Sequence, residues 1–333
     1  MKLSQIGEFG LIELLKKAES GKQKADTVIG IGDDAAVMQI PNSKFQIPNK
    51  SKISKSKHQR YFLVTTDTLI ENIHFKLKNT SFFDLGYKAL AVNISDIAAM
   101  GGWPTHALVT IGLPKKVLVE QVRQFYAGIN SLAKRHGIDI IGGDTVASPK
   151  EIVVSITLLG EVEKENLLTR SGAKVGDAIL ATGEFGKPAA LKFDSRKLKV
   201  VSRTREARKI AKSWMATSMI DSSDGLVRSV IEICRMSKVG ARIWLDSVPI
   251  AKGANLDQAL YGGEEYELVF TVPKEKAVKV VGWLGRACRQ AGGLVKMKVS
   301  IVGEIVSKKR GVKLVDVHGK VYLPKSGGYE HFK

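Results

Sequence analysis

Seven aspartates of this 333-residue chain lie in short strings rich in glycine, serine or threonine, and residues of these types at this spacing can hold metal ions. Carboxylates that a fold brings together repel one another, so their convergence requires cations. Carboxylate oxygens with hydroxyls and carbonyls beside them suit Mg²⁺, which proteins usually hold with a few carboxylates plus the phosphates of a substrate. The pattern therefore predicts a multi-magnesium site for phosphate chemistry. The strings are Gly30–Asp34, Thr65–Thr68, Asn93–Asp96, Gly142–Thr145 and Asp221–Gly225.

A single string of aspartate and glycine has a simpler explanation, because both residues favour turns. Five strings in one chain weaken that explanation without removing it. Calcium suits the pattern less well than magnesium, since no string has the spacing of an EF-hand loop. In the first string Asp34 is the candidate ligand, and Asp33 has the alternative role of a turn residue that orients Asp34.

The elements around these strings must deliver the carboxylates to one place. Tyr61–Thr66 is rich in β-branched and aromatic residues, so it predicts a strand with Asp67 at its end. The Ala-rich segment Asp84–Met100 predicts a helix that carries Asp96 near its C-terminal end. Further helices are expected over 8–18, 117–136, 204–214, 225–237 and 274–291, and further strands over 105–113, 152–162, 178–182, 242–245, 267–272 and 294–306.

Two glycines precede the aspartate of the fourth string. Gly142, Gly143 and Asp144 follow the short apolar segment Ile138–Ile141. We expect the three residues to project from the end of a strand, where glycine backbone can approach a phosphate closely.

The order of helices and strands predicts a mixed α/β (α+β) fold in two domains, residues 1–163 and 164–333. A hydrophobic content of 44% allows a substantial core at this length. The boundary is expected where the charged stretch Glu163–Arg170 precedes the turn signal Ser171–Asp177. Because the aspartates come from both halves, the site should lie at the junction of the two domains. No P-loop or dinucleotide-binding glycine motif is visible.

Composition also bears on where the protein works. The sequence has no run of about 18 apolar residues that could span a membrane. It starts without the apolar core of a signal peptide. Its two cysteines, Cys234 and Cys288, are far apart in sequence and lack the spacing of a zinc site, which fits a reducing compartment. We expect a cytoplasmic protein with no membrane partner.

A formal net charge of +19 raises the alternative of a nucleic-acid or acidic partner. The stretch Asn42–Arg60 carries six basic residues and no acidic one. It is expected to be a solvated loop, and a contact with nucleic acid stays the alternative. Such a contact is the less favoured of the two, because this stretch lacks the interleaved aromatic residues that stack on bases.

In their order and identity the strings resemble one known family, thiamine-monophosphate kinase, within the ATP-using enzymes related to aminoimidazole ribonucleotide synthetase. The resemblance extends over nearly the whole chain. Any one motif would be weak, and the ordered combination is specific. The motifs are Gly30–Ala36 (GIGDDAA), Thr66–Phe75 (TDTLIENIHF), Lys88–Gly101 (KALAVNISDIAAMG), Gly142–Thr145 (GGDT), Leu168–Gly176 (LTRSGAKVG), Asp221–Leu226 (DSSDGL), Gly262–Leu268 (GGEEYEL) and Gly328–Phe332 (GYEHF).

The resemblance implies ATP-dependent phosphorylation of thiamine monophosphate to thiamine diphosphate. It also implies a homodimer, with an N-terminal domain that joins its partner through strands and a C-terminal α/β domain that covers the nucleotide. The implied magnesium ligands are Asp34, Thr65, Thr66, Asp67, Asp96, Asp144, Asp221 and Asp224. The implied ATP contacts are Tyr126, Gly143, Asp144, Arg170 and Ser223, and the implied contacts to thiamine monophosphate are His74, Glu264 and Tyr329. Tyr126 has an equally good explanation as a core residue of its helix.

No protein nucleophile is expected, because the attacking group is already a phosphate oxygen with a second pKa of about 6. Sibling ATP-dependent synthetases of the same superfamily remain an alternative, although the chain lacks the early cysteine of selenium chemistry and the C-terminal cysteine of hydrogenase maturation. The chain departs from the family pattern at Glu265, at Ser222, at Gly183–Pro188 and in the region 194–214 that follows.

Overall fold

The computed structural model describes the chain except for residues 1–2, 19–25, 40–58, 195–198, 291–297 and 332–333. The expected basic loop Asn42–Arg60 lies, apart from its last two residues, outside the described part. The α-helices are α1 Leu3–Ala18, α2 Phe82–Ala99, α3 Val119–His136, α4 Lys187–Ala190, α5 Thr204–Lys212, α6 Leu226–Ser237, α7 Leu256–Tyr261 and α8 Lys274–Gln290. Short 3₁₀ turns cover Lys164–Asn166, Leu245–Ser247 and Lys308–Arg310.

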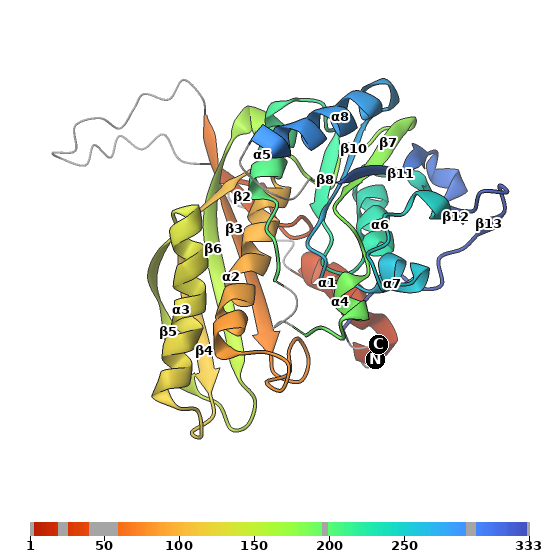
Figure 1. The fold of residues 1–333 in the computed structure, drawn as a ribbon. Coiled ribbons are helices and arrows are strands. Elements are labelled where there is room, and N and C mark those ends of the chain that lie inside the picture. Colours follow the sequence, from red (N-terminus) through yellow and green to blue (C-terminus); the bar gives the residue numbers. More distant parts are fainter. Residues whose placement is uncertain (1–2, 19–25, 40–58, 195–198, 291–297, 332–333) are drawn as a thin grey trace.

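The strands form two sheets, one in each half of the chain (Figure 1). The first sheet has the order β1-β2-β3-β6-β4-β5, and the second has the order β13-β12-β9-β11-β7-β10-β8. Neighbouring strands are antiparallel except for the pairs β4–β5 and β9–β12. The first sheet comprises β1 Thr27–Ile29, β2 Ala36–Gln39, β3 Arg60–Ile70, β4 Trp103–Leu113, β5 Asp139–Ala147 and β6 Val153–Glu163. The second comprises β7 Asp177–Thr182, β8 Ser218–Asp221, β9 Gly240–Trp244, β10 Leu268–Pro273, β11 Val299–Val306, β12 Val312–Val315 and β13 Val321–Tyr322. The fold is therefore mixed α/β, as predicted.

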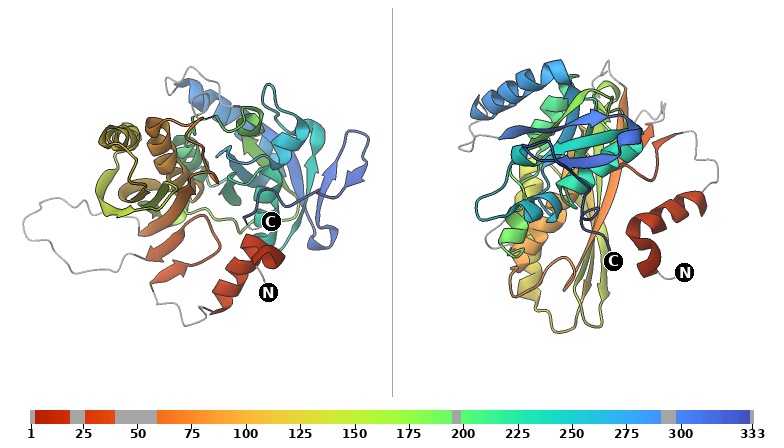
Figure 2. Two further views of the ribbon diagram at one scale, coloured as in Figure 1. Left: turned by 90° about the horizontal axis from the view of Figure 1, so that it is seen from below. Right: turned by 90° about the vertical axis from the view of Figure 1, so that its right-hand side faces the viewer.

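The first sheet has one covered and one open face. Alternate residues of β3 such as Leu63 and Leu69 are buried beneath α2 and α3, because successive side chains of a strand point to opposite faces. The residues between them lie on the open face, where cross-strand pairing joins Met38 to Phe62 and Thr157 to both Thr66 and Leu108. Figure 2 shows the two helices on one side of this sheet. Apolar side chains are thus exposed on the other side: Met38, Phe62 and Leu108 are 36%, 37% and 39% exposed.

Two glycines let α2 and α3 pack closely. A Cβ on Gly86 would lie 1.9 Å from the Phe125 carbonyl oxygen, and a Cβ on Gly128 would lie 2.0 Å from the Phe83 carbonyl oxygen. The start of α2 is fixed by Ser81, whose hydroxyl oxygen accepts a hydrogen bond from the Asp84 amide at 3.0 Å. The N-terminal cap is therefore Ser81, three residues before the predicted start of the helix.

The central strands of the second sheet are buried on both faces. In β7, Ile179 and Ala181 belong to the core beneath α6 and α7, while Leu180 packs on the other face with α5 and α8. The same alternation continues in β10 with Val269 and Phe270. The sequences of strands that are buried on both faces are nearly continuous apolar runs.

Helix α2 lies between the two sheets. It packs on β3, β4 and β6 of the first sheet and also contacts α5 and β8 of the second half. Ala98, near its end, belongs to the core that it shares with α5 and α8. Polar side chains on α2 can therefore reach both halves of the molecule.

The prediction for the segment that carries Asp144 was wrong. Strand β5 does not end at Ile141 but runs through Gly142 and Gly143 to Ala147. The glycines permit this because their φ angles are +158° and +151°, and a Cβ on Gly143 would lie 1.8 Å from the Val109 carbonyl oxygen of β4. Within the described residues, no helix has the length and apolar character needed to cross a bilayer.

Candidate active site

Three buried or half-buried aspartates from distant segments meet where the two halves of the chain join. Asp34 lies in the turn between β1 and β2, Asp96 in the last turn of α2, and Asp221 at the end of β8. One carboxylate oxygen of each lies within 4.8 Å of the others. We call these three residues the acid cluster. The site at the junction of the two halves therefore contains three of the predicted ligands.

Hydroxyl groups and one arginine hold the acid cluster in place. Thr65 of β3 donates a hydrogen bond to Asp96 Oδ2 at 2.6 Å. Ser95, the neighbour of Asp96 on α2, donates to Asp221 Oδ2 at 2.7 Å across the two halves. Arg170 donates through Nε and Nη2 to Asp34 Oδ1 at 3.0 and 2.5 Å, so its planar group faces a carboxylate, where contact with an ATP phosphate was predicted.

Asp33 has the contacts of a turn residue. Its carboxylate accepts hydrogen bonds from the Arg170 amide and from the Asp34 amide, each at 3.1 Å. These contacts fix the turn that presents Asp34, which agrees with the alternative role expected for Asp33.

Electrostatics make the acid cluster unfavourable for several ionised carboxylates at once. Burial, with the neighbouring carboxylates adding to it, raises the pKa of Asp221 to about 8 and that of Asp67 to about 6. Burial also raises the pKa of Asp34 and, further, that of Asp96, for which Asp67 and Asp221 are the next causes. Asp34 Oδ2 is buried and makes no hydrogen bond within the described residues. This set of oxygens fits a divalent cation, which would both satisfy the orphan oxygen and offset the negative charge.

A cleft of about 810 Å³ opens beside the acid cluster. Asp67 and Thr66 of β3 line it, as do Ser223 and Asp224, which follow β8. Asn93 fixes the position of Asp67, because the Asp67 amide donates a hydrogen bond to the Asn93 side-chain oxygen at 3.1 Å. Burial raises the pKa of Asp224 to about 6. Asp67 lies within β3 and not at its end, since that strand continues to Ile70.

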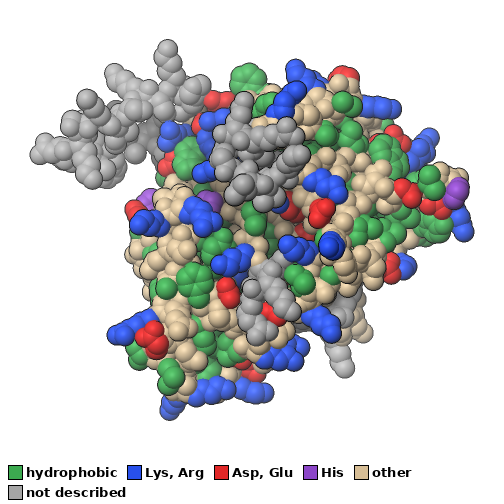
Figure 3. All heavy atoms as spheres, viewed as in Figure 1, with side chains coloured by type: hydrophobic (Ala, Val, Ile, Leu, Met, Phe, Trp, Pro, Cys, Tyr) green, Lys and Arg blue, Asp and Glu red, His purple; other side chains and the backbone are tan. Residues whose placement is uncertain are grey.

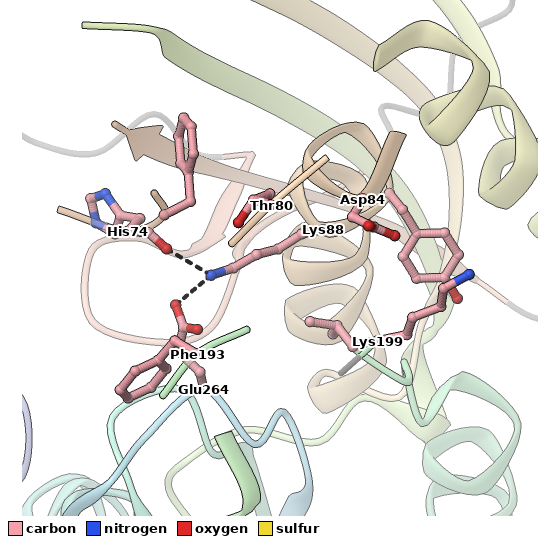
Figure 4. A pocket seen from close by; sticks show the side chains of 10 residues that line it. His74, Thr80, Asp84, Lys88, Phe193, Lys199 and Glu264 are labelled. Carbon is pink, nitrogen blue, oxygen red and sulfur yellow. Dashed lines mark hydrogen bonds and ion pairs between the residues drawn. The ribbon is translucent and has the colours of Figure 1, made fainter. Parts of the chain in front are cut away.

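The three residues expected to contact thiamine monophosphate line the same cleft: His74, Glu264 and Tyr329. Glu264 accepts a hydrogen bond from Lys88 Nζ at 2.6 Å, and the same amine donates to the His74 carbonyl oxygen at 3.0 Å (Figure 4). Tyr329 is 47% exposed. These residues come from the β3–α2 connection, the loop before β10 and the C-terminal segment, so three distant parts of the chain meet at this end of the cleft.

Hydrogen bonds give His74 a defined protonation state. Its Nδ1 accepts from the Ile70 amide at 2.9 Å, so the neutral ring carries its proton on Nε2, which lies 3.4 Å from His331 Nε2. Burial, with His331 and Lys88 as further causes, lowers the pKa of His74 to about 4. His331 Nδ1 in turn lies 3.4 Å from the Tyr329 hydroxyl. The His331 amide donates to Glu8. Figure 2 shows helix α1, which carries Glu8, beside the C-terminal segment.

Four predicted residues are not brought to the acid cluster in a single chain. Asp144 pairs with Thr110 of β4. Thr110 is two residues from Leu108 and therefore faces outward as Leu108 does, so Asp144 lies on the open face of the first sheet. Three strand intervals, roughly 14 Å, separate β5 from β3, and Asp67 lies on the opposite face. Gly143, the neighbour of Asp144 on β5, is likewise distant from the acid cluster. The Thr66 side chain also faces outward, with its hydroxyl donating to the Ile156 carbonyl oxygen, and Tyr126 packs against the core on α3, edge-on to Phe125.

The polar residues of α2 that form hydrogen bonds to the site residues were not identified from the sequence. Lys88, Asn93 and Ser95 are buried on a helix that is otherwise mostly apolar. Buried polar side chains need partners, so their presence in an Ala-rich helix was the available signal. Glu8 and Phe193, which also line the cleft, gave no such signal.

Comparisons with known proteins agree with this arrangement. Residues 32–162 match the family model of the AIR synthase related protein, N-terminal domain, and residues 174–316 match that of the C-terminal domain. Thiamine-monophosphate kinase of Bacillus subtilis (strain 168) is 32% identical over 98% of this chain and 100% of its own length. The enzyme of the same name from Escherichia coli (strain K12) is 32% identical over 98% of each chain.

Solved structures give the same result. AaThiL complexed with AMPPCP and TMP has a TM-score of 0.77 and 29% identity, with 99% of each chain covered. The HypE–HypF complex gives a TM-score of 0.69 at 18% identity over 95% of this chain and 98% of its own, a likeness of fold alone. With relatives of this identity matched over nearly their whole length, the chain belongs to the thiamine-monophosphate kinase family, within the AIR synthase related proteins.

Proposed function

We propose that this protein transfers the terminal phosphoryl group of ATP to thiamine monophosphate and so forms thiamine diphosphate and ADP. The observation that carries the proposal is that one cleft has Asp67 and Asp224 beside the acid cluster and His74, Glu264 and Tyr329 in its wall. The related AaThiL was solved with TMP and with AMPPCP, an analogue of ATP, which supports the same pair of substrates.

The reaction needs little covalent chemistry from the protein. The attacking oxygen belongs to the acceptor phosphate, so the work of the chain is to position two anions in line and to reduce their repulsion. We propose Asp34, Thr65, Asp67, Asp96, Asp221 and Asp224 as the residues that hold several Mg²⁺ ions in the cleft. When bound, these ions supply the positive charge that offsets the phosphates of both substrates.

The substrate end of the cleft has the groups to orient thiamine monophosphate. Tyr329 offers an exposed aromatic face, and Glu264 offers its second carboxylate oxygen beside the one that Lys88 binds. Neutral His74 can donate a hydrogen bond from Nε2 without adding charge to the cleft. Ser223, Arg170 and the residues of the acid cluster are proposed to bind the nucleotide side.

We further propose a homodimer built on the open face of the first sheet. Met38, Phe62 and Leu108 expose apolar surface there, and Asp144 lies on the same face. The cleft reaches this face, because Thr66 and Thr68 line it, so a second copy would border the cleft and could bring its own Gly143 and Asp144 to the nucleotide. The domains 1–163 and 164–333, the former as the dimerisation domain, are part of this proposal.

Mixing two inactive variants tests the dimer. If Asp144 acts across the interface, Asp67→Asn and Asp144→Asn chains refolded together should regain about a quarter of the wild-type rate, because half of the dimers are mixed and each has one intact site. If both residues act within one chain, the mixture stays as inactive as either variant.

A cytoplasmic location is proposed on the basis of Cys234, which is buried as a free thiol. On the face shown in Figure 3, Lys and Arg side chains are spread among acidic and apolar ones. This distribution of basic side chains does not favour a surface that binds nucleic acid over the active site of an enzyme that acts on small anionic substrates.

The activity is tested by incubating the purified protein with ATP, Mg²⁺ and thiamine monophosphate and following thiamine diphosphate and ADP by chromatography. Thiamine and an aminoimidazole precursor serve as parallel substrates. Equal amounts of thiamine diphosphate and ADP are expected. Consumption of ATP only with another acceptor would replace this proposal with a sibling synthetase activity.

A further inference from the structure

The short helix α4 ends in an unusual way beside the cleft. The Lys192 amide donates to the Ala189 carbonyl oxygen at 3.0 Å and the Phe193 amide donates to the Pro188 carbonyl oxygen at 2.8 Å, which is the hydrogen-bond pair of a Schellman motif. Such an end usually has glycine in the left-handed position, but here Lys192 and Phe193 have φ angles of +52° and +54°. Two successive side chains are thus held in a conformation that costs free energy, and strain of this kind gathers at ligand sites.

Phe193 lies in the wall of the cleft that is proposed to bind the substrate. It lines the main cleft together with His74, Glu264 and Tyr329, and it lines the smaller adjoining pocket with Lys88 (Figure 4). Of the four Phe and Tyr side chains that line the main cleft within the described residues, Phe75 and Tyr266 are only 5% and 8% exposed. Phe193 and Tyr329 are 44% and 47% exposed, so these two can offer ring faces to a ligand.

The charge around Glu264 makes an aromatic face important. Lys88 lies 2.6 Å from Glu264, and the side chains of the pair are 10% and 24% exposed. The pair has no net charge, so Glu264 is a weaker partner for a cation than an unpaired carboxylate would be. A flat cationic ring in this part of the cleft therefore depends on π faces, which attract cations within about 6 Å of the ring centre.

We propose that Phe193 is a specificity-determining residue whose ring covers the positively charged heteroaromatic ring of the substrate, with Tyr329 as the second aromatic wall. This inference rests on the proposed function, since thiamine monophosphate carries a thiazolium cation. Phe193 lies between the two segments that depart from the family pattern, 183–188 and 194–214, and it belongs to none of the shared motifs.

The test compares a cationic ligand with a neutral one. Binding of thiamine monophosphate and of the monophosphate of deazathiamine, in which a neutral thiophene replaces the thiazolium, is measured by calorimetry on the full chain. The proteins are the wild type, Phe193→Leu, Phe193→Tyr and, as a control that loses an exposed ring on β13, Tyr322→Leu. The KM for ATP is measured for each, because a general loss of structure would change it as well.

We expect Phe193→Leu to weaken thiamine monophosphate binding roughly five- to thirty-fold and to weaken binding of the neutral analogue much less. Phe193→Tyr should keep the preference for the cation, and Tyr322→Leu should match the wild type. Unchanged binding in Phe193→Leu, or an equal loss for both ligands, overturns the inference while the kinase activity stands. If the wild type forms no thiamine diphosphate, the proposed function fails and this inference fails with it.

Discussion

Replacement of Lys88 by methionine should destabilise the protein by removing an ion pair that joins its two halves. Lys88 belongs to α2, whereas Glu264 precedes β10 of the second sheet. At the 2.6 Å separation of Nζ and Oε1, an effective dielectric constant of about 20 gives an attraction of about 6 kcal/mol before any cost of removing the charges from water. That cost cancels much of the attraction, since the two side chains are only 10% and 24% exposed.

The net loss is expected to be about 1–3 kcal/mol in the free energy of unfolding, because the Glu264 carboxylate and the His74 carbonyl oxygen both lose a charged donor. Urea denaturation without ligands, followed by tryptophan fluorescence, measures it. A double-mutant cycle with Glu264→Gln should give a coupling energy of about 1–2 kcal/mol.

A matched surface pair gives the control. Lys325 lies 2.7 Å from Asp257, but the two side chains are 70% and 60% exposed, so Lys325→Met should leave the denaturation midpoint unchanged. The reasoning is refuted if Lys88→Met is tolerated as well as Lys325→Met, or if the cycle shows no coupling between Lys88 and Glu264.

Three further outcomes are expected. Asp67→Asn or Asp144→Asn should lose most turnover through weaker engagement of metal and ATP, and near-normal turnover at ordinary Mg²⁺ would reject that role. Because burial raises the pKa of Asp221 to about 8 and of Asp67 to about 6, the folded state holds protons that the unfolded state releases above about pH 4, so the melting temperature in chelator should fall as the pH rises from about 5 to 8. Added Mg²⁺ should raise it more at the higher pH, and a pH-independent effect of Mg²⁺ would contradict this account. Gly86→Ala places a Cβ 1.9 Å from the Phe125 carbonyl oxygen and should lower the free energy of unfolding by about 1–3 kcal/mol, measured by urea denaturation with the exposed helical Gly282→Ala, whose Cβ meets nothing within 4 Å, as the control.

Much of the local structure could be predicted from the sequence because it depends on local signals. The helix over 84–100 was expected from its Ala-rich composition and is observed as α2, with Asp96 near its end. The strand expected over 267–272 is observed as β10. In these segments propensity, periodicity and burial all favour the same element.

The rest depends on pairing between distant segments, which local patterns do not encode. Asp144 was expected beside the other ligands, but the neighbouring strand β4 fixes the register of β5 and so decides which face Asp144 occupies. The four-residue strand β8, which carries Asp221, is too short for a period to be recognised. The pairing of Lys88 with Glu264 joins residues 176 positions apart, and no single-segment pattern reports it.

The position of α2 between the sheets limits how the two halves of such a protein can be recombined. Consider a chimera that takes residues 1–163 from this chain and the remainder from a relative. Lys88 and Ser95 then come from this chain, whereas the positions of their partners, Glu264 and Asp221, come from the relative. Substitutions at these contacts must therefore change together across the crossover point. Exchange of halves should succeed between parents that share both pairs, and fail between parents that share only the overall fold.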